Sequence, residues 1–123
     1  MILEITIPGE LPGLNEIIDA AKTHWGGYKE MKETYTSLVR LKCLCLPKLK
    51  KPVKITITWH TKDNRRDPDN VMAGQKFILD GIVSAEVIPN DTRRWVKEIS
   101  HVFPEPDRAN PRAEIKIEEE ETE

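Results

Sequence analysis

The sequence predicts an α+β fold, a single two-layer domain over residues 1–123 with helices packed on one face of a mixed sheet. Three observations predict it. Segments with alternating apolar residues stand at both ends and in the middle of the chain, and segments with helical spacing lie between them. No internal repeat or long linker divides the sequence. The expected order of elements is β-α-β-α-β-β.

Two strands are expected in the first half of the chain. In ILEITI, at 2–7, the apolar residues Leu3, Ile5 and Ile7 fall on one face, which is the period of a half-buried strand. VKITITWH, at 53–60, alternates in the same way and is the clearest strand signal in the chain. In the second segment the polar residues Lys54, Thr56, Thr58 and His60 take the other face.

Two helical regions are expected beside these strands. The first extends from about residue 15 to 46, where the paired glycines of WGGY are expected to interrupt or fray it. The second should start near Asp69 and continue to about Ala85. Its inner side should carry the apolar residues Val71, Met72, Ile78, Leu79, Ile82 and Val83.

The last third of the chain predicts two further strands, RRWVKEISHVF at 93–103 and RAEIKIE at 112–118, joined by a proline-rich turn. Residues 114–123 hold six of the 21 acids, so the chain is expected to end in a solvated acidic tail.

Residues 22–66 hold twelve bases and three acids. Such a basic block attracts phosphate, although a solvated lysine-rich surface explains it equally well.

Composition excludes several classes of protein. The chain is 38% hydrophobic and 33% charged, which is ordinary for a soluble domain, and no run of ~18 apolar residues could form a transmembrane helix. The first residues lack the basic leader of a signal peptide, so a cytoplasmic location is expected. Cys43 and Cys45 are poorly spaced for a mutual disulfide and are expected to be reduced.

The segment RRDPDN contains the candidate metal ligands Asp67 and Asp69. A kink at Pro68 followed by a helix start could place both carboxylates at one helix end, where Mg²⁺ would find the hard oxygen ligands that it prefers. The alternative is structural: Asp69 caps the helix N-terminus, and Asp67 is a surface acid beside two arginines. Both interpretations remain open on these residues alone.

A third carboxylate and a lysine complete the candidate site. Asp91 lies in a loop before a strand, so a short loop permits it to return beside Asp69, but it is otherwise an ordinary turn residue. Lys76 follows Asp69 by seven residues and therefore falls on nearly the same helix face. Its amine could point back to the acids, or it could pair with Asp80 at i+4.

These residues resemble a known family, the RusA-type Holliday junction resolvases, which are endodeoxyribonucleases of bacteria and their prophages. The resemblance rests on RRDPDN, KFILDGIV, VIPNDTRRW and LPGLNE, and it spans most of the chain. It implies a homodimeric Mg²⁺-dependent nuclease that cuts four-way DNA junctions by paired nicks. The family's three essential aspartates match Asp67, Asp69 and Asp91. The family's lysine position is Ala73 here, so the role of Lys76 is a geometric inference.

The resulting hypothesis is hydrolysis of a DNA phosphodiester, during recombination and repair, at a Mg²⁺ held by the three aspartates, with no organic cofactor and no membrane partner. The residues expected to bind DNA are Arg65, Arg66, Arg93, Arg94, Lys22, Lys29 and Lys32. The alternative is a prophage DNA-binding protein of the same fold without catalysis. Trp25 and Tyr28 are expected to pack in the core rather than to stack on unpaired bases.

Overall fold

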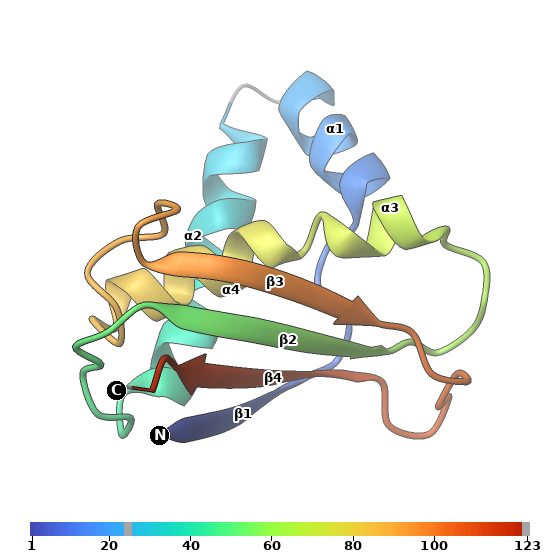
Figure 1. Ribbon diagram of the computed structural model, residues 1–123. Helices are drawn as coiled ribbons and strands as arrows, with labels where there is room; N and C mark the ends of the chain where they lie inside the picture. Colours follow the sequence, from blue (N-terminus) through green and yellow to red (C-terminus); the bar gives the residue numbers. More distant parts are fainter. Residues whose placement is uncertain (24–25, 122–123) are drawn as a thin grey trace.

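The computed structural model describes residues 1–23 and 26–121 and contains a four-stranded mixed sheet (Figure 1). The strands are β1 (Ile2–Pro8), β2 (Val53–His60), β3 (Val96–Val102) and β4 (Arg112–Glu119), in the spatial order β1-β4-β2-β3. Strand β4 is antiparallel to both β1 and β2, whereas β2 and β3 are parallel. The parallel pair matters for the site because β2 and β3 begin at the same end of the sheet.

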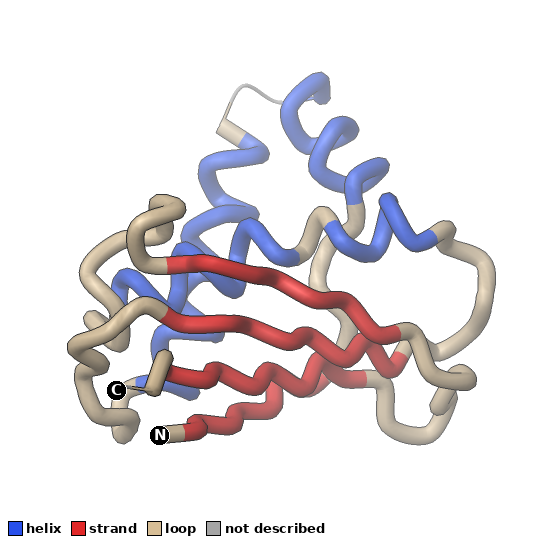
Figure 2. Tube along the Cα trace, in the orientation of Figure 1, coloured by secondary structure: helices blue, strands red, loops and turns tan. Residues whose placement is uncertain are grey.

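The helices lie on one face of this sheet (Figure 2), which confirms the predicted α+β fold with helices on a single side. They are α1 (Leu14–Thr23), α2 (Gly27–Cys43), α3 (Pro68–Met72) and α4 (Gln75–Ser84). Alternation in the strands explains the arrangement: every second residue of β1, β2 and β4 is buried beneath the helices. The residues between them are more exposed, and in β2 and β4 they are all polar.

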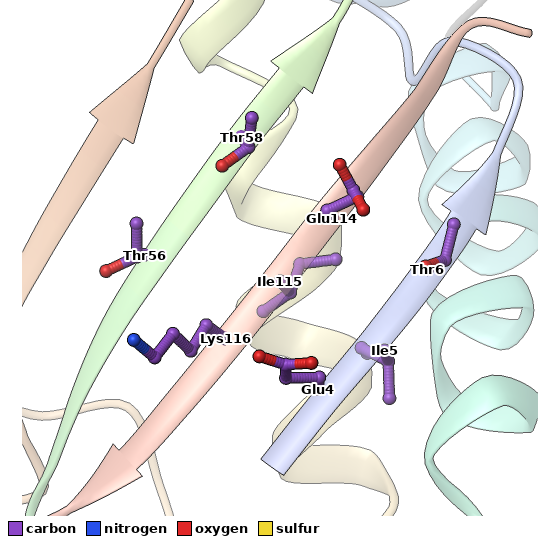
Figure 3. A pocket seen from close by; sticks show the side chains of 8 residues that line it. All are labelled: Glu4, Ile5, Thr6, Thr56, Thr58, Glu114, Ile115 and Lys116. Atoms are coloured by element: carbon purple, nitrogen blue, oxygen red, sulfur yellow. The ribbon is translucent and has the colours of Figure 1, made fainter. Parts of the chain in front are cut away.

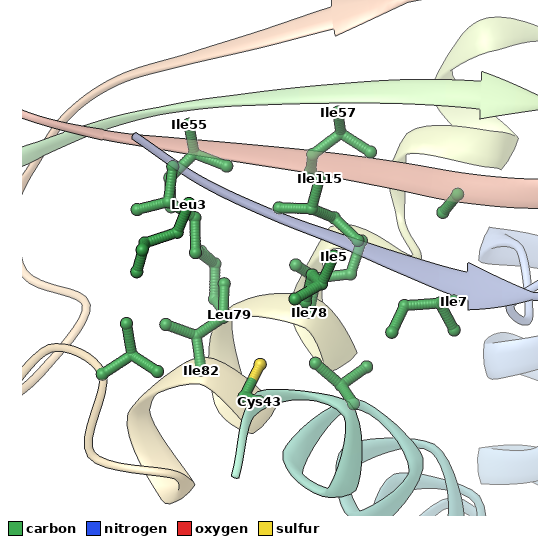
Figure 4. Close-up of a cluster of buried hydrophobic side chains, with 14 of the residues drawn as sticks. Leu3, Ile5, Ile7, Cys43, Ile55, Ile57, Ile78, Leu79, Ile82 and Ile115 are labelled. Carbon is green, nitrogen blue, oxygen red and sulfur yellow. The ribbon is translucent and has the colours of Figure 1, made fainter. Parts of the chain in front are cut away.

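The core fills the space between the sheet and helices α2 and α4 (Figure 4). Phe77 is the largest fully buried side chain, and its ring centroid lies 5.6 Å from that of Tyr35 on α2. Cys43 and Cys45 are not joined; burial raises the pKa of the Cys43 thiol to about 11, so this thiol behaves as a small apolar group. The labelled core residues are Leu3, Ile5, Ile7, Cys43, Ile55, Ile57, Ile78, Leu79, Ile82 and Ile115.

Both predicted helical regions are divided in the structure. The first becomes α1 and α2, separated near the expected WGGY interruption, and Trp25 lies outside the described residues. The second is broken between α3 and α4 at Gly74, where a Cβ would lie 3.1 Å from side-chain atoms of both Leu11 and Trp59. Strand β3 begins at Val96 rather than at 93, because Thr92 first closes a turn by accepting hydrogen bonds from two downstream amides.

His101 joins β3 to β2 and α4 through both of its ring nitrogens. Trp59 Nε1 donates to His101 Nδ1 at 2.9 Å, and the two rings stack with centroids 6.1 Å apart. Since Nδ1 accepts, Nε2 carries the proton and donates to Gln75 Oε1 at 2.9 Å. Burial lowers the pKa of His101 below its usual value of 6.5.

This arrangement predicts a pH-dependent stability. Below pH ~6.5 His101 becomes protonated in the unfolded chain but stays neutral in the folded chain, because its folded pKa is lower. The free energy of unfolding therefore falls as the pH drops from about 6.5 to the folded pKa. Below that value the His101 contribution stays constant. Urea unfolding of the parent and of His101→Gln at pH 7.5, 6 and 5 measures it. The stability difference between the two proteins should shrink on acidification, and a constant difference would contradict the prediction.

Candidate functional site

Pro68 sets the position of the RRDPDN segment at the start of α3, as the sequence predicted. Asp67 has the extended backbone favoured before a proline (φ −69°, ψ 159°), and Pro68 occupies the first helical turn. The backbone carbonyl of Asp67 accepts the first helical hydrogen bond, from Val71 N at 3.1 Å. Asp67 and Asp69 therefore stand at the same helix end.

Neither of these carboxylates caps the helix or pairs with an arginine. Asp67 occupies the N-cap position of α3, but its side chain makes no capping hydrogen bond. Asp69 accepts only from the adjacent amide of Asn70, at 2.9 Å, so the interpretation of Asp69 as the N-cap is wrong. Both side chains are exposed, and neither forms an ion pair within the described ranges 1–23 and 26–121. The result is a pair of free carboxylates on a fixed helix start.

Arg66 binds the N-terminal loop instead of the neighbouring acids. Its guanidinium lies 3.2 Å from Glu10 Oε2 and 3.9 Å from Glu16 Oε1, and it donates to the carbonyl of Leu11 at 3.2 Å. The side chain is only 20% exposed. Arg66 was expected to bind DNA; its contacts instead give it a structural role, because a phosphate would have to displace these partners. Arg65 is 87% exposed beside Asp63 and remains available.

Asn70 makes the second link between RRDPDN and the LPGLNE loop. Its Oδ1 accepts from the amide of Asn15 at 3.1 Å, which satisfies a free N–H at the start of α1. Gly13 passes so close that a Cβ there would lie 2.5 Å from the same oxygen. We call this set of contacts the loop clamp: Arg66 and Asn70 on one side, Glu10, Leu11, Gly13, Asn15 and Glu16 on the other. The sequence contained both segments, but nothing in it indicated that they touch.

Asp91 does not join Asp67 and Asp69 within one chain. It precedes β3, whereas the two other aspartates follow β2, and these strands are parallel. The segment between α4 and β3 therefore lies at the opposite end of the sheet from α3 (Figure 1). The paired part of β2 between them, Val53 to Thr58, is about 17 Å long at ~3.3 Å per residue. Over the described part of the chain, no three His, Cys, Asp or Glu side chains form a metal-binding group.

Lys76 points away from the aspartates. Its Nζ lies 3.3 Å from Asp80 Oδ1 and forms the i+4 pair that was the alternative interpretation. Lys32 approaches the other oxygen of Asp80, at 3.8 Å. The expected return of the Lys76 amine toward Asp69 assumed one continuous helix. Between α3 and α4 the backbone instead makes tighter i→i−3 hydrogen bonds, from Gly74 N to Val71 O and from Lys76 N to Ala73 O, which changes the number of residues per turn. The structure therefore gives no support to a catalytic role for Lys76.

The predicted DNA-binding cations occupy separate places. Lys22 and Lys29 are exposed on α1 and α2, respectively, while Lys32 is engaged by Asp80. Arg93 and Arg94 are exposed in the loop before β3, at the same end of the sheet as Asp91. The structure thus puts Arg93 and Arg94 near Asp91, and the exposed Arg65, which pairs with Asp63 at 3.8 Å, near Asp67 at the other end of the sheet. Tyr28 is half-buried on α2.

The sheet face opposite the helices contains a shallow hollow of about 230 Å³ across β1, β4 and β2 (Figure 3). Its lining mixes acids, threonines and one lysine, and it includes none of the predicted site residues: Glu4, Ile5, Thr6, Thr56, Thr58, Glu114, Ile115 and Lys116.

Comparison with known proteins adds no assignment: no family model matches the chain, and no curated protein matches its sequence. Among the described residues, no helix is both long and apolar enough to cross a membrane.

Proposed function

We propose that this protein is a magnesium-dependent, structure-specific endodeoxyribonuclease that resolves Holliday junctions by paired nicks. The observation that carries the proposal is the pair of exposed, unpaired carboxylates of Asp67 and Asp69 at the start of α3. Exposed acids beside arginines would ordinarily pair with them. Here Arg66 is committed to the loop clamp, which leaves both acids for a ligand.

The donor set fits Mg²⁺. This ion keeps several waters and uses one or two protein carboxylates together with substrate phosphate, which is what two free aspartates on an exposed helix end provide. Bound there, it would supply charge neutralisation at the scissile phosphate and a more acidic water. Asp67 and Asp69 would hold the ion, and Arg65, exposed next to them, would attract the adjacent phosphate. The loop clamp keeps the helix start in place.

A homodimer would complete this site. Asp91 lies at the far end of its own sheet, so it can share a metal ion only with Asp67 and Asp69 of a second copy of the chain. A two-fold axis that brings Asp91 of the partner subunit to Asp67 and Asp69 creates two equal sites. Arg93 and Arg94 would then accompany Asp91 to the same phosphates. Two equal sites suit a four-way junction, in which two opposing strands must be cut, and the protein would work in the cytoplasm.

A second candidate is a DNA-binding protein of this fold without catalysis. The Lys76–Asp80 pair favours it, because the lysine expected to stabilise charge on the reacting phosphate is held elsewhere. It predicts junction binding that is independent of Mg²⁺ and of Asp91, with no nicked product.

The test is cleavage of a synthetic four-way junction in the presence of Mg²⁺. Asp69→Asn should reduce the nicking rate about 100-fold or more, because a metal ligand contributes several kcal/mol to the transition state. Asp19→Asn, an exposed acid on α1, is the matched control and should nick at the parental rate. Undiminished nicking by Asp69→Asn would refute the metal-binding role, and a parent without nicking activity would favour the second candidate.

A further inference from the structure

A second hollow, of about 260 Å³, lies directly beside Asp67. It forms because the parallel strands β2 and β3 end at the same end of the sheet, so the segments that follow them face each other (Figure 1). The segment after β2 contributes Asn64, Arg66 and Asp67, and the segment after β3 contributes Phe103 and Glu105. The hollow is smaller than the ~300–1,000 Å³ typical of sites for drug-sized ligands, so it suits one ring system.

Phe103 gives this hollow an aromatic wall. Its side chain is 41% exposed, although a phenyl ring of this size usually contributes to the core. No aromatic ring of the described residues pairs with it. The preceding residue, Val102, is 45% exposed but does not line the hollow. Phe103 therefore offers a free ring surface next to the candidate metal ligands.

The charges around the hollow disfavour binding of a phosphate and favour binding of a neutral ring. Three carboxylates line it, those of Asp63, Asp67 and Glu105, and the one cation, Arg66, is occupied by Glu10. An anion would be repelled unless a metal lay beside Asp67. A nucleobase is uncharged, stacks on an aromatic ring, and can present amino N–H groups to carboxylate and amide oxygens.

We propose that the hollow holds a single unstacked nucleobase of the DNA branch point, stacked on Phe103, while the adjoining phosphate lies at Asp67 and Asp69. This inference rests on the proposed function, since it names the part of the junction that the same site recognises. It explains a preference for branched DNA: a base at a branch point is free to leave its stack, whereas a base in a continuous duplex must first be unpaired.

Binding without catalysis tests the inference. A four-way junction with 2-aminopurine at the branch point, and a linear duplex of the same sequence, are titrated in Ca²⁺ in place of Mg²⁺, because Ca²⁺ also takes carboxylate oxygens and offsets the charge of Asp67 and Asp69. Phe103→Ala should weaken junction binding about 5- to 150-fold and leave duplex binding unchanged, because one stacked base is lost. Phe103→Trp should restore the affinity for the junction. It should also restore the change in 2-aminopurine fluorescence that the parent causes on binding. Val102→Ala is the matched control and should bind both DNAs as the parent does.

The outcomes separate this inference from the proposed nuclease. If Phe103→Ala binds the junction like the parent, or loses affinity for both DNAs equally, the base subsite is wrong. Nicking by the parent in Mg²⁺ would still stand in that case. If the parent binds the junction through Phe103 but never nicks it, the nuclease is wrong and the subsite stands. A parent that binds neither DNA overturns both.

Discussion

An equal mixture of the Asp69→Asn and Asp91→Asn variants should nick a four-way junction, although each variant alone should be inactive. In the proposed dimer, each site combines Asp67 and Asp69 of one subunit with Asp91 of the other. A mixed dimer then has one site with both substitutions and one site with none. Random pairing makes about half of the dimers mixed, so about a quarter of the parental sites are intact.

The opposite arrangement gives the opposite result. If all three aspartates of a site came from one subunit, every site in a mixed dimer would contain one substitution, and mixing would restore nothing. The measurement is nicking of one labelled strand after the variants have been mixed, unfolded and refolded together to exchange subunits. A mixture of Asp69→Asn with Asp67→Asn is the control, because both changes affect the same half-site and should not complement. Complementation by the control would contradict the model.

The location of the strands was predictable because alternation is a local property. The boundaries of β1, β2 and β4 agree with the sequence prediction to within one residue. The break at Gly74 was not predicted, and neither was the close approach of Leu11 and Trp59, which come from other elements and leave no room for a Cβ at this position. The same interruption bears on Lys76, which pairs with Asp80 in the structure. Seven residues return to the same face only along an uninterrupted helix.

The candidate site shows the same division between local and distant causes. Pro68 was expected to set Asp67 and Asp69 at one helix end, and it does so, since a proline restricts both its own backbone and that of the residue before it. The loop clamp was missed, because it depends on the meeting of segments about 55 residues apart. For Asp91, the sequence could not distinguish a return to its own helix start from a position at the other end of the sheet.

Replacing Gly81 with alanine should destabilise the protein by about 1–3 kcal/mol, although alanine is the better helix former. Gly81 lies in α4 where that helix meets α2. A Cβ at this position would lie 2.4 Å from Val39 Cβ and 2.5 Å from Val39 Cγ1. Val39 is fully buried, so it cannot move aside without disturbing the core. In an exposed helix the same change would instead stabilise by about 1 kcal/mol.

Urea unfolding measures this effect as a lower midpoint with an unchanged slope. Ser84→Ala is the matched control: it changes an exposed residue of the same helix, adds no atom and should raise stability slightly. Equal or greater stability of Gly81→Ala would show that α2 and α4 do not pack this closely.

The substitution should also affect catalysis. Helix α4 connects the end of the sheet that carries Asp69 to the end that carries Asp91, so a displaced α4 should alter the match between the two halves of the proposed dimeric site and reduce nicking more than junction binding.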